Sequence, residues 1–140
     1  DTTEKIEDVE IVEPKAFKIG KIGYDKLLVY NTKPENGYGA KLVQTAQLFM
    51  RVDAEETDES NANLVITDNV ASIAPDSEWA VAAKDGKIYI AGASRYAVDV
   101  AYVKFQDVIA DMKGKYSFPE KVLGSGKLPS KENSRLPVGG

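Results

Sequence analysis

The residues of this sequence that could do chemistry gather first in two short turns. Residues 37–40 (Gly-Tyr-Gly-Ala) and 92–95 (Gly-Ala-Ser-Arg) each separate a strand-like run from a helix-like run. A glycine-rich turn before a helix can hold a phosphate on the free N–H groups of the first helical turn. The third glycine of the dinucleotide-binding pattern would fall at Leu42, so we interpret the first turn as a flexible entry to a helix.

The second turn places Ser94 where some hydrolases carry a nucleophile. The second glycine of that pattern would fall at Tyr96, and the chain has no histidine to activate a serine. Ser94 is therefore predicted to cap the helix that follows it. The free N–H groups of this turn and the charge of Arg95 leave a small anion site open as an alternative.

Carboxylates form a third group, in the acidic run 53–59. Calcium takes oxygen ligands, but the run lacks the spacing and the glycine of an EF-hand loop. A glycosidase needs two carboxylates that face each other across a pocket, and nothing in this run indicates a pocket. We interpret the run as a solvated loop and predict no metal, no cofactor and no catalytic residue.

Aromatic side chains are the last group with binding potential. The chain has seven tyrosines and one tryptophan, which could stack on the face of a sugar. Tyr38 and Tyr96 flank the two turns, whereas core packing explains most of the others. With Arg95 they form a predicted carbohydrate-binding platform, which requires that the two rings be exposed and coplanar.

The composition excludes several classes of function. The chain has 140 residues, a net charge of −4 and a pI of about 4.9, which argues against nucleic acid or an anionic membrane as the main partner. It has no Cys and no His, so disulfides, Cys/His zinc sites and histidine triads are excluded. No run approaches the roughly 18 apolar residues of a membrane span.

The strongest local pattern is a hairpin that leads into a helix. Asp85-Gly86 predicts a turn between strands 78–84 and 87–91. Beyond Ser94, apolar residues recur with helical spacing as far as Met112 and predict one buried face, made by Val98, Ala101, Tyr102, Phe105, Val108, Ile109 and Met112. Gly114 is predicted to end this helix.

Upstream, the pattern predicts a strand over 26–31, a helix from Tyr38 or Ala40 to about Asp53, and a strand over 63–68. The apolar face of that helix is predicted from Leu42, Val43, Ala46, Phe49 and Met50. Residues 16–24 read as a loop because of Gly20 and Gly23. A short edge strand is expected over 9–13.

The order β-α-β-β-β-α predicts an α+β fold. We expect a two-layer sandwich, with one mixed or antiparallel sheet of about four to five strands and two helices on one face. Residues 1–25 are expected to be a partly ordered lead-in, 26–118 the domain, and 119–140 a linker or tail that is rich in Gly, Ser, Pro and Lys.

Residues 84–105 resemble the end of a known domain family. Asp85, Gly86, Ile88, Ile90, Gly92, Arg95, Ala101 and Phe105 match the small α/β domain that flanks the catalytic barrel in family 20 β-hexosaminidases, α-glucuronidases and related secreted bacterial carbohydrate-active proteins. The likeness extends over about 26–112, with residues 40–49 similar to the first helix and 64–66 to the second strand. The family has Arg-Gly where this chain has Arg95-Tyr96.

The resemblance implies a role without catalysis, because in that family the small domain only flanks the barrel. We expect this chain to be a non-enzymatic accessory domain of a secreted or cell-surface bacterial carbohydrate-processing protein that buttresses a neighbouring domain. The chain itself carries no signal peptide, and it is expected to be cut from something longer. The alternatives are a module that binds carbohydrate or another partner through exposed tyrosines, and a stand-alone structural domain.

Overall fold

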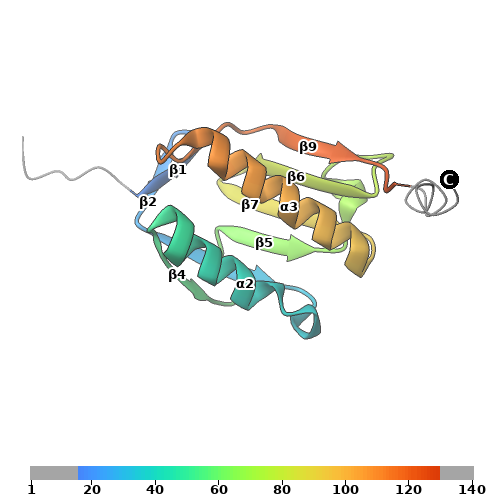
Figure 1. Ribbon diagram of the computed structural model, residues 1–140, viewed down its shortest axis with the longest axis horizontal. Coiled ribbons are helices and arrows are strands. Elements are labelled where there is room, and N and C mark those ends of the chain that lie inside the picture. The colour runs from blue at the N-terminus through green and yellow to red at the C-terminus, as the bar shows by residue number, and fades with distance from the viewer. Residues whose placement is uncertain (1–15, 130–140) are drawn as a thin grey trace, which may run out of the picture.

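The computed structural model describes residues 16–129, and its main part is a six-stranded sheet covered by two helices (Figure 1). The order of strands across this sheet is β4 (Asp53–Glu56), β3 (Lys26–Asn31), β5 (Leu64–Thr67), β7 (Lys87–Gly92), β6 (Trp79–Lys84) and β9 (Val122–Gly126). β3, β4, β5 and β7 are parallel, while β6 is antiparallel to both of its neighbours.

Helices α2 (Tyr38–Thr45) and α3 (Arg95–Met112) lie on the same face of this sheet (Figure 1). Alternate strand residues point toward them, because successive side chains of a strand point to opposite faces. The central strands supply the innermost of these core residues, each at most 1% exposed: Leu27, Val29, Leu64, Ile66, Ile88 and Ile90. From α3, Phe105 and Ala101 are fully buried against them, as the helical spacing predicts.

A second, smaller core covers part of the opposite face. There the short helical turn η3 (Val70–Ser72) follows β5, and Val70 and Ala74 pack on Ala80 and Ala91 of the sheet. After β5 the chain therefore turns to the face opposite the two helices, whereas after β3 it turns to the face that carries α2.

The connection from β4 to β5 must pass β3, which lies between them. Both ends of this connection are tied to β3, since the Thr57 N–H donates to the Val29 carbonyl and the Asn63 N–H to the Leu28 carbonyl. The buried Asn63 side chain adds two more bonds, accepting from the Leu28 N–H at 2.8 Å and donating to the Lys26 carbonyl at 3.0 Å. The Asn63 side-chain amide thus extends the pairing with β3 by hydrogen bonds just before β5 begins.

The chain is ordered beyond both of the expected domain limits. Residues 16–24, expected as a loop, form β1 (Phe17–Ile19) and β2 (Ile22–Tyr24), and these make a second sheet with β8 (Ser117–Phe118). Residues 122–126, expected in the tail, are the edge strand β9. The α+β class is confirmed, but the single sheet of four to five strands is wrong. The strand expected over 9–13 lies outside the described residues.

The first helix is shorter than its apolar pattern predicts. After Thr45 the chain continues as a π-helix, η2 (Ala46–Met50), and Arg51 ends it with a left-handed backbone at φ 59°. The wider turn places Phe49 outward, 70% exposed, so its predicted core position is wrong. The acidic run that follows is in part the edge strand β4, in which only Ala54 is buried.

Candidate functional site

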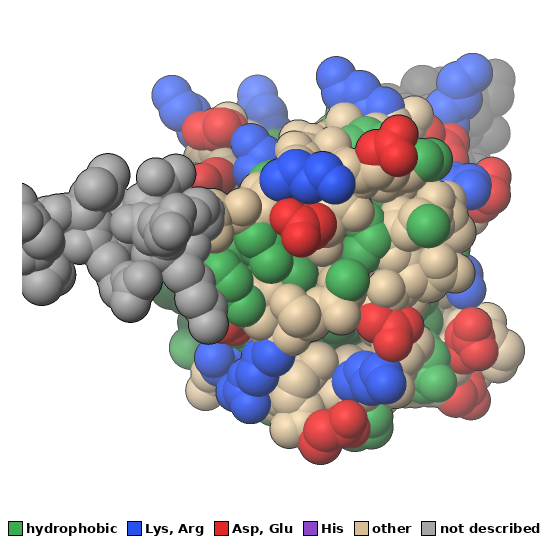
Figure 2. Space-filling model, turned by 90° about the vertical axis from the view of Figure 1, so that its right-hand side faces the viewer, with side chains coloured by type: hydrophobic (Ala, Val, Ile, Leu, Met, Phe, Trp, Pro, Cys, Tyr) green, Lys and Arg blue, Asp and Glu red, His purple; other side chains and the backbone are tan. Residues whose placement is uncertain are grey.

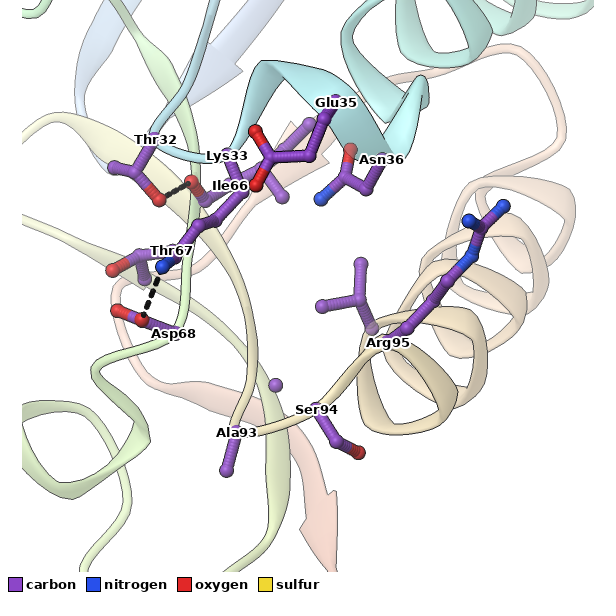
Figure 3. A pocket seen from close by; sticks show the side chains of 12 residues that line it. Thr32, Lys33, Glu35, Asn36, Ile66, Thr67, Asp68, Ala93, Ser94 and Arg95 are labelled. Carbon is purple, nitrogen blue, oxygen red and sulfur yellow. Dashed lines mark hydrogen bonds and ion pairs between the residues drawn. The ribbon is translucent and has the colours of Figure 1, made fainter.

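A cleft opens where the parallel strands β3, β5 and β7 end, beside the first turn of α3 (Figure 3). Its volume is about 260 Å³. We call it the carboxyl-edge cleft. It lies at this place because the chain leaves β3 and β5 toward opposite faces of the sheet, and such a divergence leaves a crevice at the carboxyl ends of the strands.

One wall of the cleft is the turn that follows β3, built on η1 (Pro34–Asn36). The Asn36 Oδ1 accepts hydrogen bonds from the Asn31 side chain at 2.7 Å and from the Tyr38 N–H at 2.9 Å. The Thr32 hydroxyl donates to the Ile66 carbonyl at 2.9 Å, which joins this wall to β5. These bonds fix the turn and leave the amide nitrogen of Asn36 as a donor for a ligand.

The opposite wall is the strand-to-helix turn that the sequence singled out. Ser94 is the N-cap of α3, and its Oγ accepts from the Ala97 N–H at 3.1 Å, so the predicted capping role is confirmed. Gly92 lets the strand approach the helix closely, because a Cβ there would lie 2.6 Å from the Ala97 carbonyl carbon. Glycine at this position is therefore a requirement of packing.

Charges of both signs line the cleft. Lys33 and Arg95 supply two cations and Glu35 and Asp68 two carboxylates, and the Lys33 ammonium lies 3.6 Å from the Asp68 carboxylate. Glu35 extends from η1 on one side, and Arg95 extends from the start of α3 on the other (Figure 3). Figure 2, which faces this edge of the molecule, shows basic and acidic side chains interspersed. The two cations and the two carboxylates balance, so the net charge of the cleft lining is close to zero.

Of the three predicted platform residues, only Arg95 lines this cleft. Tyr96 is 51% exposed on α3. Tyr38 is 3% exposed, with its ring centroid 5.2 Å from that of Tyr102 and the Lys41 ammonium above it. A platform made by Tyr38 and Tyr96 is therefore wrong, because the Tyr38 ring packs between the two helices.

Sequence reasoning did not select the polar residues that follow β3 and β5, namely Thr32, Lys33, Glu35, Asn36, Thr67 and Asp68. The signal that would find them is their place directly after two buried strands. It depends on knowing that these strands are parallel neighbours, since only then do their carboxyl ends meet at one edge. The acidic run lies elsewhere, where Glu55 and Asp53 pair with Lys26 at 2.9 and 3.9 Å.

Within residues 16–129, no three Asp, Glu, His or Cys side chains lie close enough together to hold a metal ion. No helix in this part of the chain is long and apolar enough to cross a membrane. Comparisons of the chain with protein-family models, with curated proteins and with solved structures each found no match.

Proposed function

We propose that this chain is a non-catalytic accessory domain of a secreted or cell-surface bacterial carbohydrate-processing protein, and that its carboxyl-edge cleft contacts carbohydrate. The observation that carries this proposal is the charge-balanced lining of the cleft, in which two cations and two carboxylates stand beside apolar surface at the carboxyl edge of the sheet. The resemblance of residues 84–105 to the small domain of barrel-containing glycosidases supports a parent protein that processes carbohydrate.

The balance of charges favours a neutral ligand rich in hydroxyl groups. An anion would gain from Lys33 and Arg95 but would meet Glu35 and Asp68, which line the same cleft. A sugar ring presents both donors and acceptors, and carboxylates and guanidinium groups satisfy these in turn. The volume of about 260 Å³ lies just below the range of roughly 300–1,000 Å³ of drug-sized ligand sites, which suits a single ring.

A titration followed by NMR tests this proposal. Neutral monosaccharides, a uronic acid and an amino sugar are added to the full chain, and amide shifts are recorded. We expect a neutral sugar to shift the amides of Thr67, Ala93 and Arg95. Arg95→Ala should weaken the binding about tenfold, the loss expected for a hydrogen bond to a charged group.

Arg51→Ala is the matched control, because Arg51 is also an exposed arginine but does not line the cleft. It should leave the affinity unchanged. Shifts that gather elsewhere, or none with any sugar at millimolar concentration, would reject the carbohydrate contact.

A second role in the same parent protein is to buttress a neighbouring domain. Its support is that Leu48 and Val103 are 64% and 54% exposed on the helix layer, where a neighbouring domain would cover them. The reading frame of the parent gene on both sides of residues 1–140 tests this role. We expect an export signal and a barrel-sized region, and a frame that encodes no further domain would contradict it.

A further inference from the structure

A groove of about 410 Å³ lies between the end of the first helical segment and the last turns of α3. We call it the helix-layer groove, and the residues that matter here are Thr45, Phe49, Ile109, Ala110, Lys113 and Tyr116. Phe49 stands at its side with 70% of its surface exposed. A large aromatic ring exposed beside an apolar groove is a surface that another segment would cover.

The N-terminal part of the chain leaves the described structure next to this groove. The Lys18 N–H donates to the Tyr116 carbonyl at 2.9 Å, so β1 begins beside Tyr116. The Tyr116 hydroxyl in turn donates to the Phe49 carbonyl at 3.4 Å, across the groove. At about 3.3 Å per residue, the six residues from Phe17 back to Ile11 reach roughly 20 Å, enough to place Ile11 in the groove.

The charge of residues 1–15 is opposite to that of several side chains near the groove. This segment has six carboxylates and two lysines, so it carries the whole net charge of −4, and residues 16–140 are neutral overall. Lys113 lines the groove, Lys115 precedes Tyr116, and Arg51 follows the π-helix that carries Phe49. All three cations are exposed, whereas Asp107 is the one carboxylate among the lining residues described.

We propose that residues 9–13 (Val-Glu-Ile-Val-Glu) bind in the helix-layer groove of the same chain. Val9 and Ile11 share one face of an extended segment and pack against Phe49 and Ile109. Glu13 shares the face of Val9 and Ile11 and would pair with the cations around the groove, whereas Glu10 faces away from it. This inference is independent of the proposed carbohydrate contact, which lies at the other end of α3.

A spin label tests the docking directly, because the chain has no cysteine and one introduced cysteine is labelled uniquely. In full-length Glu10→Cys the nitroxide points away from the groove. We expect the amide NMR signals of Phe49, Ala110 and Gly114 to lose most of their intensity, whereas those of Ile88 and Ile90 stay sharp and report an intact fold. Reduction of the label should restore all signals.

Two sets of variants distinguish specific binding of residues 9–13 in the groove from mere nearness of the N-terminal segment to it. Val9→Ser with Ile11→Ser should restore the groove signals, while Val12→Ser is the matched control and should not. Lys113→Glu with Lys115→Glu should also reduce the loss of groove signal that the label causes, and Lys121→Glu should not.

Either of two outcomes would overturn the proposal. One is that the groove signals keep their intensity in labelled Glu10→Cys. The other is that unlabelled, isotope-enriched chains lose the groove signals to the same extent when they are mixed with labelled chains, which would assign the groove to a second copy.

Discussion

Ser94 links the stability of α3 to the geometry of the carboxyl-edge cleft. It caps the helix, lines the cleft and stands two residues after Gly92, whose missing side chain lets the helix backbone approach β7. Asn36 does the same on the other wall, where one carbonyl oxygen fixes both the end of β3 and the start of α2. The side chains that shape the cleft are thus also those that begin the helices.

Replacing Ser94 tests this link at the scale of a single residue. Ser94→Ala removes the acceptor for the Ala97 N–H, and we expect the free energy of unfolding in urea to fall by about 1 kcal/mol. Ser94→Asp keeps an acceptor at the cap and adds a charge that the helix N-terminus favours, so it should retain the stability of the parent chain. Equal losses in both variants would show that the hydrogen bond is not the cause.

At the scale of elements, the sequence predicted those helices and strands whose formation depends on residues close together in the chain. The hairpin β6–β7 forms at Asp85-Gly86, where both residues have positive φ, and α3 runs from its cap at Ser94 to Met112. β4 escaped prediction because its outward residues are acidic, and β9 because glycine and serine alternate in it. Both are strands only because β3 and β6 supply their partners, which local pattern does not reveal.

The cleft was predictable only in part for the same reason. Its helix wall, with Ser94 and Arg95, follows from the pattern of one continuous stretch. Its other wall comes from residues 32–36, which meet that stretch because β3, β5 and β7 are parallel neighbours. The π-helix had no signal of its own, since residues 46–50 continue the apolar spacing of α2.

Tyr24 joins the small sheet to the large one, and its titration tests that junction. Its hydroxyl donates to the Gly86 carbonyl at 2.7 Å, and its ring stacks on Phe17. Burial first, and then the Glu120 carboxylate, raise the pKa of Tyr24 above its ordinary value of 10.0. The folded state therefore holds this proton more tightly than the unfolded state, so the stabilisation is complete below pH 10 and is lost as the pH rises through the raised pKa.

Tyr24→Phe keeps the ring and removes the hydroxyl. At pH 8 we expect it to be less stable than the parent chain by about 1 kcal/mol. Between pH 9 and 11 this difference should shrink, as measured by urea unfolding at each pH. Burial together with Asp85 and Glu59 raises the pKa of Tyr89 as well, but Tyr89 is present in both chains and cancels in the difference. A difference that stays constant to pH 11 would contradict the assignment.

At the scale of the whole molecule, strands from both ends of the described chain pair with strands that lie far from them in the sequence. β1 and β8 pair although they lie at opposite ends of the sequence, and β9 completes the sheet after α3. Strand pairing therefore extends from Phe17 to Gly126, beyond the range 26–118 that composition predicts for the domain, and we expect residues 17–126 to unfold as one cooperative unit.

Shortened chains test these limits. A chain of residues 1–118 lacks β9, so β6 loses its outer partner, the Glu78 N–H loses the Gly126 carbonyl and the Ala83 N–H loses the Lys121 carbonyl. Leu123 also leaves the main core. We expect the free energy of unfolding to fall by at least about 2 kcal/mol, since several net hydrogen-bond contributions of about 1 kcal/mol are lost together.

A chain of residues 1–129 keeps all these contacts, including the bond from the Leu128 N–H to the Glu78 carboxylate, and should unfold like the parent chain. If both shortened chains unfold alike, β9 lies outside the cooperative unit; if only the shorter one is destabilised, the sheet needs its sixth strand.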